Sequence, residues 1–222
     1  MADNTATKPK PKPSSSPIKT GYLIFYNAVS AILWLTVLGR VVGVVAVRGP
    51  QLAYPAVGDF CKWTQTLAGM EVLHSLFGIV RAPLVTTFMQ VFSRYAIVWG
   101  VTGLFPGLGA SPAYSSMLVA WSVTEVVRYS YFALTLSGLR PAPLHWLRYH
   151  AFFVLYPLGI SSEAWLIWRA AGPARDAVHP LYGAALWAYV VFVYPPSAYI
   201  LYTHMMTQRR KVLKASDTKA TQ

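Results

Sequence analysis

The sequence predicts an all-α protein, a polytopic membrane helix bundle with six transmembrane helices. The first observation is composition: 55% of the 222 residues are hydrophobic and only 12% are charged, whereas an ordinary soluble domain carries roughly 25% charged residues. The second is a series of long apolar segments separated by turns that contain glycine and proline. The third is length, because about 20 residues per span leave room for about six helices and for no folded aqueous domain.

The apolar segments predict the spans in chain order. They are 22–47, 63–80, 84–104, 114–136, 144–168 and 181–206. We expect loops at 49–62 and 169–180, where glycine and proline interrupt the apolar pattern. Pro157 lies inside the fifth span, and Pro195 and Pro196 lie inside the sixth, so both spans are expected to be kinked.

The two ends of the chain are basic and polar. Residues 1–19 predict a disordered cytosolic tail, 20–206 the transmembrane domain, and 207–222 a second basic cytosolic tail. The tails hold nine of the 19 basic residues, and positive charge beside a span favours the cytosolic side. Both termini are therefore predicted to be cytosolic, and nucleic acid is not an expected partner. Three basic residues oppose this topology because they flank a connection on the lumenal side: Arg40, Arg48 and Lys62.

Aspartates and glutamates lie in different parts of the chain. All four aspartates lie in tails or loops, whereas Glu71, Glu125 and Glu163 lie inside predicted spans. Arg94 and Arg128 also lie inside spans, and such charges cost a few kcal/mol unless they are paired. We predict that Glu125 and Arg128 join a buried cluster with Arg94 or Glu71. These residues either hold the bundle together as ion pairs or line a polar reaction cavity, and the sequence alone leaves both interpretations open.

Tyr156 and Glu163 form a second pattern within the fifth span. Seven residues at about 100° each return nearly to the same helical face, about 10.5 Å along the axis. A hydroxyl and a carboxyl group that face one cavity can share proton abstraction and proton donation. From spacing alone, a structural role for this pair is more common than a catalytic one.

Several chemistries lack their motifs. The chain has no dinucleotide-binding glycine pattern, no phosphate-binding P-loop, no H-E-x-x-H and no G-x-S-x-G. The five histidines form no dense cluster, and Cys61 has Leu67 where a cysteine phosphatase would need an arginine. We therefore expect no metal and no cofactor.

Three stretches resemble one known family. They are residues 70–101, 121–132 and 147–167, the last containing LYP-x-G-x-x-SE. They are similar to the 3-hydroxyacyl-CoA dehydratases of fatty-acid elongation, also called protein-tyrosine-phosphatase-like A proteins, which include the PASTICCINO proteins. The resemblance implies six spans in the endoplasmic reticulum membrane with cytosolic termini. It also implies dehydration of (3R)-3-hydroxyacyl-CoA to trans-2-enoyl-CoA, the third step of very-long-chain fatty-acid elongation.

The resemblance places the family's catalytic residues on Tyr156 and Glu163. Acyl-CoA is then the substrate, and the ketoacyl synthase, ketoacyl reductase and enoyl reductase of the cycle are the expected partners in the bilayer. Candidate substrate-binding residues are Arg81, Arg94, Arg128, Arg148 and Tyr149. The alternative is a non-enzymatic membrane scaffold or a small carrier associated with lipid synthesis.

Overall fold

The computed structural model describes residues 16–220, and every regular element in that range is a helix. The predicted all-α class is confirmed. Most of the predicted tail at 1–19 lies outside the described residues, as do positions 221–222.

The first two passages of the chain are formed by α1 (Pro17–Arg48), α2 (Ala53–Leu67) and α3 (Gly69–Leu76), with a short 3-10 turn at Pro50–Leu52. The prediction of a loop at 49–62 is wrong, because α2 begins at Ala53 and includes Pro55 and Gly58. Pro55 is the third residue of α2, where a backbone N–H has no partner within the helix. Proline therefore starts this helix rather than breaking it.

The next passages are α4 (Leu84–Tyr95) with a π-helical continuation at Ala96–Val101, and α5 (Pro112–Leu136) after a 3-10 turn at Pro106–Ala110. These bounds agree closely with the predicted third and fourth spans. The Ser111 side chain caps α5 by accepting a hydrogen bond from the backbone N–H of Ala113.

The fifth predicted span is two helices, α6 (Ala142–His150) and α7 (Phe152–Ala177), which meet at a bend of 45°. The expected kink is present, but it falls at Ala151 rather than at Pro157. The prediction of a loop from residue 169 is wrong, because α7 continues through Pro173 to Ala177. Buried alanines at 170, 171 and 174 pack there, so packing in these last turns favours helix despite the proline.

The last passage consists of α8 (Pro180–Ala188), a π-helical segment at Tyr189–Val193, and α9 (Tyr194–Ala220). The π-helical segment ends one residue before Pro195 and Pro196, which cannot donate hydrogen bonds to the preceding turn. A local change in helical winding is a common response to such prolines. Helix α9 continues past the predicted tail boundary at residue 207.

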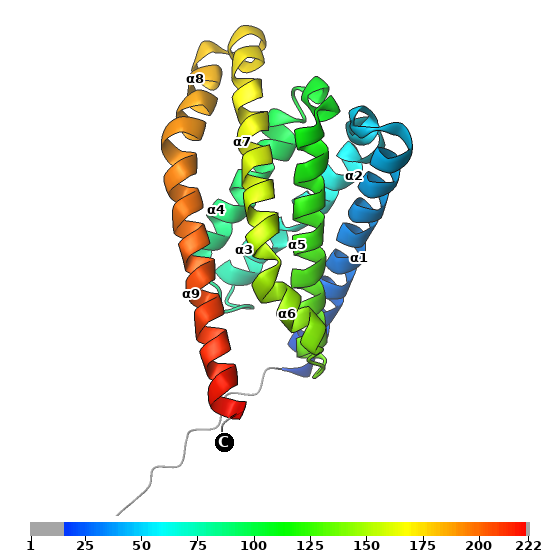
Figure 1. Ribbon diagram of the computed structural model, residues 1–222, viewed down its shortest axis with the longest axis vertical. Helices are drawn as coiled ribbons and strands as arrows, with labels where there is room; N and C mark the ends of the chain where they lie inside the picture. The colour runs from blue at the N-terminus through cyan, green and yellow to red at the C-terminus, as the bar shows by residue number, and fades with distance from the viewer. Residues whose placement is uncertain (1–15, 221–222) are drawn as a thin grey trace, which may run out of the picture.

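The long helices α1, α5, α7 and α9 run roughly along the long axis of the molecule, and α1 begins at the same end at which α9 ends (Figure 1). Helix α5 packs most extensively against α1 and α7. Its buried face changes along the helix from apolar residues, Met117 and Leu118, to Trp121, Glu125 and Tyr129. The centre of the bundle is thus apolar at one level and charged at the next.

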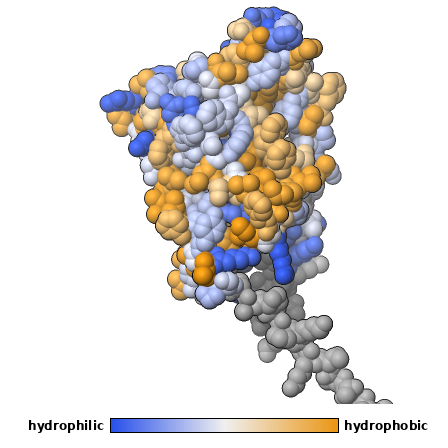
Figure 2. Space-filling view, turned by 180° about the vertical axis from the view of Figure 1, so that it is seen from behind, coloured by the Kyte–Doolittle hydropathy of each residue, from blue (hydrophilic) through white to orange (hydrophobic). Residues whose placement is uncertain are grey.

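The surface of the bundle is largely apolar. Large hydrophobic side chains such as Phe25, Phe88 and Phe192 are more than half exposed, which is expected of a protein whose solvent is lipid. Figure 2 shows hydrophobic side chains over the middle of the rear face, with strongly hydrophilic ones toward its ends. The surface therefore supports a helical membrane protein.

By length and hydropathy, three helical segments of the described chain qualify as membrane spans: Pro17–Arg48, Leu84–Val101 and Pro180–Lys211. The bent pair of α6 and α7 makes a fourth if it counts as one span. Helix α5 is not among them, and its Glu125 and Arg128 lower its hydropathy. Six spans therefore do not follow from hydropathy alone.

Candidate active site

Glu163 lies on α7 between two hydrogen-bond donors from other helices. The indole Nε1–H of Trp121 on α5 donates to Oε1 at 2.6 Å, and the hydroxyl of Tyr194 on α9 donates to Oε2 at 2.7 Å. Trp121 is only 2% exposed, and Glu163 is partly buried. Both carboxylate oxygens are thus held, each by a different helix.

Tyr156 faces the same neighbouring helix. Its hydroxyl donates to the backbone carbonyl of Ala198 on α9 at 2.9 Å, and its ring lies 5.8 Å from that of Tyr202. Ala198 is four residues after Tyr194, which is about one helical turn. Tyr156 and Glu163 therefore face α9 together, as their seven-residue spacing predicts.

Small residues bring α5 and α7 close together at this level. Gly159 is buried between Tyr156 and Glu163, and a Cβ atom placed on it would lie 3.6 Å from the Cβ of Ala120 and 3.9 Å from Oε1 of Glu163. One turn away, the hydroxyls of Ser116 and Ser162 are hydrogen-bonded at 2.8 Å. This contact fixes α7 against α5 and places Glu163 within reach of Trp121.

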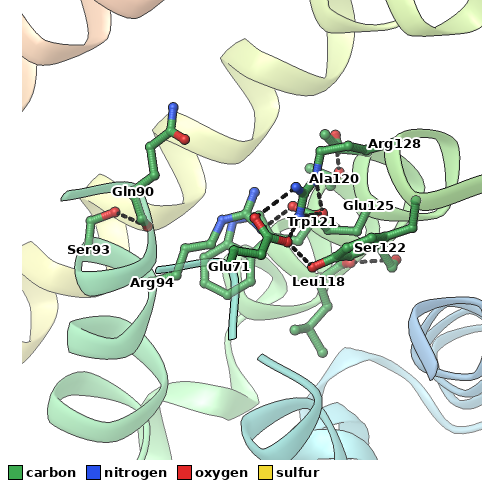
Figure 3. Close-up of polar contacts among 12 residues, drawn as sticks. Glu71, Gln90, Ser93, Arg94, Leu118, Ala120, Trp121, Ser122, Glu125 and Arg128 are labelled. Carbon is green, nitrogen blue, oxygen red and sulfur yellow. Dashed lines mark hydrogen bonds and ion pairs between the residues drawn. The ribbon is translucent and has the colours of Figure 1, made fainter. Parts of the chain in front are cut away.

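A charged network occupies the adjacent space (Figure 3). Arg128 donates to Glu71 through Nη1 at 2.9 Å and Nη2 at 2.7 Å, and its Nε donates to Glu125 at 2.6 Å. Arg94 pairs with Glu125, and the Tyr129 hydroxyl donates to Glu71. The predicted cluster is confirmed, and it contains both Arg94 and Glu71. We call Glu71, Arg94, Glu125 and Arg128 the ion network.

The ion network touches the Glu163 site through Trp121. The guanidinium of Arg94 lies 4.8 Å from the centre of the Trp121 ring, a cation–π contact. Trp121 thus contacts Arg94 with its ring and Glu163 with its N–H.

The other candidate substrate residues lie apart from this site. Arg81 is exposed in the connection between α3 and α4. Arg148 on α6 lies 4.6 Å from the ring centres of Tyr131 and Phe132, and 5.9 Å from that of Tyr149. Arg94 and Arg128 belong to the ion network. The structure therefore separates the five candidates into a central pair and a group nearer the ends of helices.

Sequence reasoning missed Trp121 and Tyr194 as partners of Glu163. Neither carries a charge, and 42 and 31 residues separate them from Glu163. It also missed Arg209 on α9, whose Nη2 donates to Nε2 of His150 at 3.2 Å and whose guanidinium lies 5.2 Å from the Phe153 ring. One sequence signal could have pointed to Trp121. It precedes Glu125 by one helical turn, so the two residues lie on the same face of the helix.

Two further features concern Cys61 and the possible metal ligands. Cys61 is 1% exposed within the core, so a substrate could not reach its thiol. Within residues 16–220 no group of three or more His, Cys, Asp or Glu side chains is arranged to hold a metal ion.

The comparisons with known proteins agree with one another. The family model described as "Protein tyrosine phosphatase-like protein, PTPLA" matches residues 65–215. A Schizosaccharomyces pombe protein named "Probable very-long-chain (3R)-3-hydroxyacyl-CoA dehydratase" is 41% identical over 208 residues, which cover 92% of this chain and 98% of the relative. The rice dehydratase PASTICCINO 2B is 35% identical over 89% of this chain and 95% of its own length.

A human relative, "Very-long-chain (3R)-3-hydroxyacyl-CoA dehydratase 2", is 33% identical over 90% of this chain and 84% of its own length. No solved structure matches the chain significantly. The family match includes α7, the whole ion network, and both donors to Glu163. The chain belongs to the protein tyrosine phosphatase-like PTPLA family, as the three resembling stretches imply.

Proposed function

We propose that this protein is a 3-hydroxyacyl-CoA dehydratase that converts (3R)-3-hydroxyacyl-CoA to trans-2-enoyl-CoA during very-long-chain fatty-acid elongation. The relatives described above carry dehydratase names and align over most of their length. The observation that carries the proposal is the common face of Tyr156 and Glu163 toward α9. A carboxylate and a hydroxyl are sufficient for this elimination, which needs one base and one acid.

We assign Glu163 as the base and Tyr156 as the acid. Both oxygens of Glu163 accept hydrogen bonds, as a carboxylate does, whereas the Tyr156 hydroxyl is a donor. Glu163 removes the proton from C2, and the electron pair of that C–H bond forms the C2=C3 double bond. The C3–O bond breaks, and the leaving oxygen takes the proton of Tyr156 to form water. The proton on Glu163 then returns to Tyr156 through solvent.

The acyl-CoA headgroup requires a cationic surface, which need not adjoin the reacting carbons. We propose that Arg148 and Arg209, with Arg81 and Tyr149, meet the CoA phosphates and the adenosine group. Arg148 and Arg209 are held against aromatic rings rather than paired with carboxylates in the contacts described above. Phosphate binds well to such guanidinium groups.

Arg148→Gln and Arg209→Gln are expected to raise KM for the acyl-CoA several-fold with little change in kcat. Removing a contact made equally in the ground state and the transition state weakens binding only. Steady-state kinetics with the CoA thioester and with a shorter pantetheine thioester measures this effect. The pantetheine substrate lacks the nucleotide phosphates, so an equal effect on both substrates would contradict the assignment.

We also propose six membrane-spanning passages in the endoplasmic reticulum, with both termini cytosolic. The beginning of α1 and the end of α9 lie at one end of the bundle (Figure 1), which supports an even number of passages. Lys62 pairs with Asp59 at 2.7 Å, so one of the three opposing charges is neutralised.

A glycosylation acceptor in a flexible spacer inserted after Gly107 is expected to be modified, and one appended after Gln222 is not. Gly107 is exposed in the turn before α5, and a Cβ atom there would meet nothing within 4 Å. Mobility shifts that disappear on deglycosylation report the modification. The reverse pattern would overturn the proposed orientation.

Dehydration is expected to proceed without metal or nucleotide, because elimination of water is redox-neutral and two side chains supply the proton transfers. Turnover by purified protein should be the same after prolonged EDTA treatment and without added nucleotide. Loss of turnover that a specific metal restores would contradict this prediction.

We propose the other elongation enzymes as partners, since a ketoacyl reductase makes the substrate and an enoyl reductase consumes the product. The alternative is a scaffold or small carrier, for which the ion network alone would be enough. Purified protein in detergent, given (3R)-3-hydroxyacyl-CoA, distinguishes the two. A dehydratase forms trans-2-enoyl-CoA in proportion to the amount of protein, and a scaffold or carrier forms none.

A further inference from the structure

The Glu163 carboxylate is oriented by contacts from two helices besides its own. Trp121 on α5 donates to one oxygen at 2.6 Å, and Tyr194 on α9 donates to the other at 2.7 Å. Two donors on different oxygens fix both the position and the plane of a carboxylate. A glutamate on a single helix, with three side-chain torsions of its own, would otherwise sample several rotamers.

The indole N–H of Trp121 needs a hydrogen-bond acceptor, and Glu163 supplies it. An indole offers one N–H donor and no acceptor, and burial makes an unsatisfied N–H costly. Its side chain is almost completely buried, and its ring lies against the guanidinium of Arg94. Arg94 pairs with Glu125, which is one turn after Trp121 on α5. The ion network therefore holds the ring whose N–H holds Glu163.

The local backbone determines the direction in which the Tyr194 side chain points. It follows the π-helical segment Tyr189–Val193 and precedes Pro195 and Pro196. A π-helical turn inserts a residue relative to regular α-helix and rotates everything after it by about 100°. The interruption thus sets which residue of α9 meets Glu163. The Tyr189 ring supports that of Tyr194 in an edge contact at 5.7 Å.

We propose that Trp121 and Tyr194 are positioning residues that hold the Glu163 carboxylate for proton abstraction, and that Trp121 connects it to the ion network. This inference rests on the proposed dehydratase function. Two further titratable groups contact the donors to Glu163: Arg94 from α4 lies over the Trp121 ring, and Tyr189 from the π-helical segment lies against the Tyr194 ring. Tyr194 from α9 donates to Glu163, Tyr156 from α7 faces α9 beside it, and Glu125 on α5 is paired with arginine.

The test uses two substitutions that remove one donor and keep the ring. Trp121→Phe deletes the N–H while retaining an aromatic face for Arg94, and Tyr194→Phe deletes only the hydroxyl. Each is expected to lower kcat roughly ten- to a hundredfold, the effect of a reacting group that is no longer held in place, with little change in KM. The acidic limb of the pH–rate profile should move to higher pH by about one unit, because fewer donors stabilise the carboxylate.

Two matched controls remove equivalent donors elsewhere. Trp99→Phe deletes an indole N–H that donates to Thr66 at 3.1 Å, and Tyr182→Phe deletes a hydroxyl that donates to the Gly100 carbonyl at 2.8 Å. Both should leave the pH–rate profile in place. In a Glu163→Gln background, Trp121→Phe should cause little further loss, since the two residues act as a unit.

The proposed function and this inference fail in different ways. An inactive wild-type protein would reject the function. An active wild type in which Trp121→Phe and Tyr194→Phe keep both kcat and the pH–rate profile would reject the positioning role alone. The same would follow if both variants lost only folded protein, measured as the monodisperse fraction in detergent, with unchanged turnover per folded molecule.

Discussion

Glu163→Gln and Tyr156→Phe are each expected to lower the dehydration rate by at least about a hundredfold, because each removes a group that transfers a proton in the proposed mechanism. Glutamine keeps the shape of glutamate but cannot accept the C2 proton, and phenylalanine keeps the ring but cannot donate. Neither change adds a charge to the membrane. Enoyl-CoA formation per folded molecule, with yield measured in parallel, gives the effect.

The double variant should be little worse than either single variant, since groups that act as a unit are strongly non-additive. Tyr182→Phe is the matched control, because its hydroxyl donates to a backbone carbonyl like that of Tyr156 but on another pair of elements. If Glu163→Gln kept most of its rate, the assignment of this carboxylate as base would be wrong.

Arg128→Ala is expected to have the largest effect on stability. Arg128 contacts both Glu71 and Glu125, so its loss leaves the buried Glu125 and the partly buried Glu71 without their shared partner. Breaking a buried pair on one side costs about 3–5 kcal/mol. The thermal midpoint in detergent and the yield of monodisperse protein should both fall sharply.

Arg128→Lys should recover only part of this loss, because an ammonium group cannot reproduce the planar, forked contacts of a guanidinium. Arg175→Ala is the control, since Arg175 and Asp176 form a pair in which both side chains are about two-thirds exposed. A normal midpoint for Arg128→Ala would show that the ion network does not stabilise the bundle.

The sequence was most informative where burial of charge is expensive. Glutamate and arginine inside apolar segments must find partners, and this requirement alone predicts the cluster of Glu125, Arg128, Arg94 and Glu71. The shared face of Tyr156 and Glu163 follows equally directly from helical geometry. What remained open was the set of neighbours, because spacing within one helix says nothing about which helices pack against it.

The two wrong loop predictions have one physical source. Glycine and proline at Pro55, Gly58 and Pro173 predict loops, yet all three residues lie in helices. Their local propensity is outweighed by position in a first turn or by packing of neighbouring side chains. Trp121 and Tyr194 were missed for another reason. A neutral hydrogen-bond donor gives no signal in the pattern of hydropathy or charge, and only the fold brings it to its acceptor.

The most direct test of the central claim is hydration of the product in water enriched in heavy oxygen. An enzyme that eliminates water from C2 and C3 must also catalyse the reverse reaction through the same groups. Wild-type protein given trans-2-enoyl-CoA should yield 3-hydroxyacyl-CoA with the heavy oxygen at C3, detected by mass spectrometry, and Glu163→Gln should yield almost none. Failure of the folded wild-type protein to form labelled hydroxyacyl-CoA, or equal labelling by both proteins, would contradict the account.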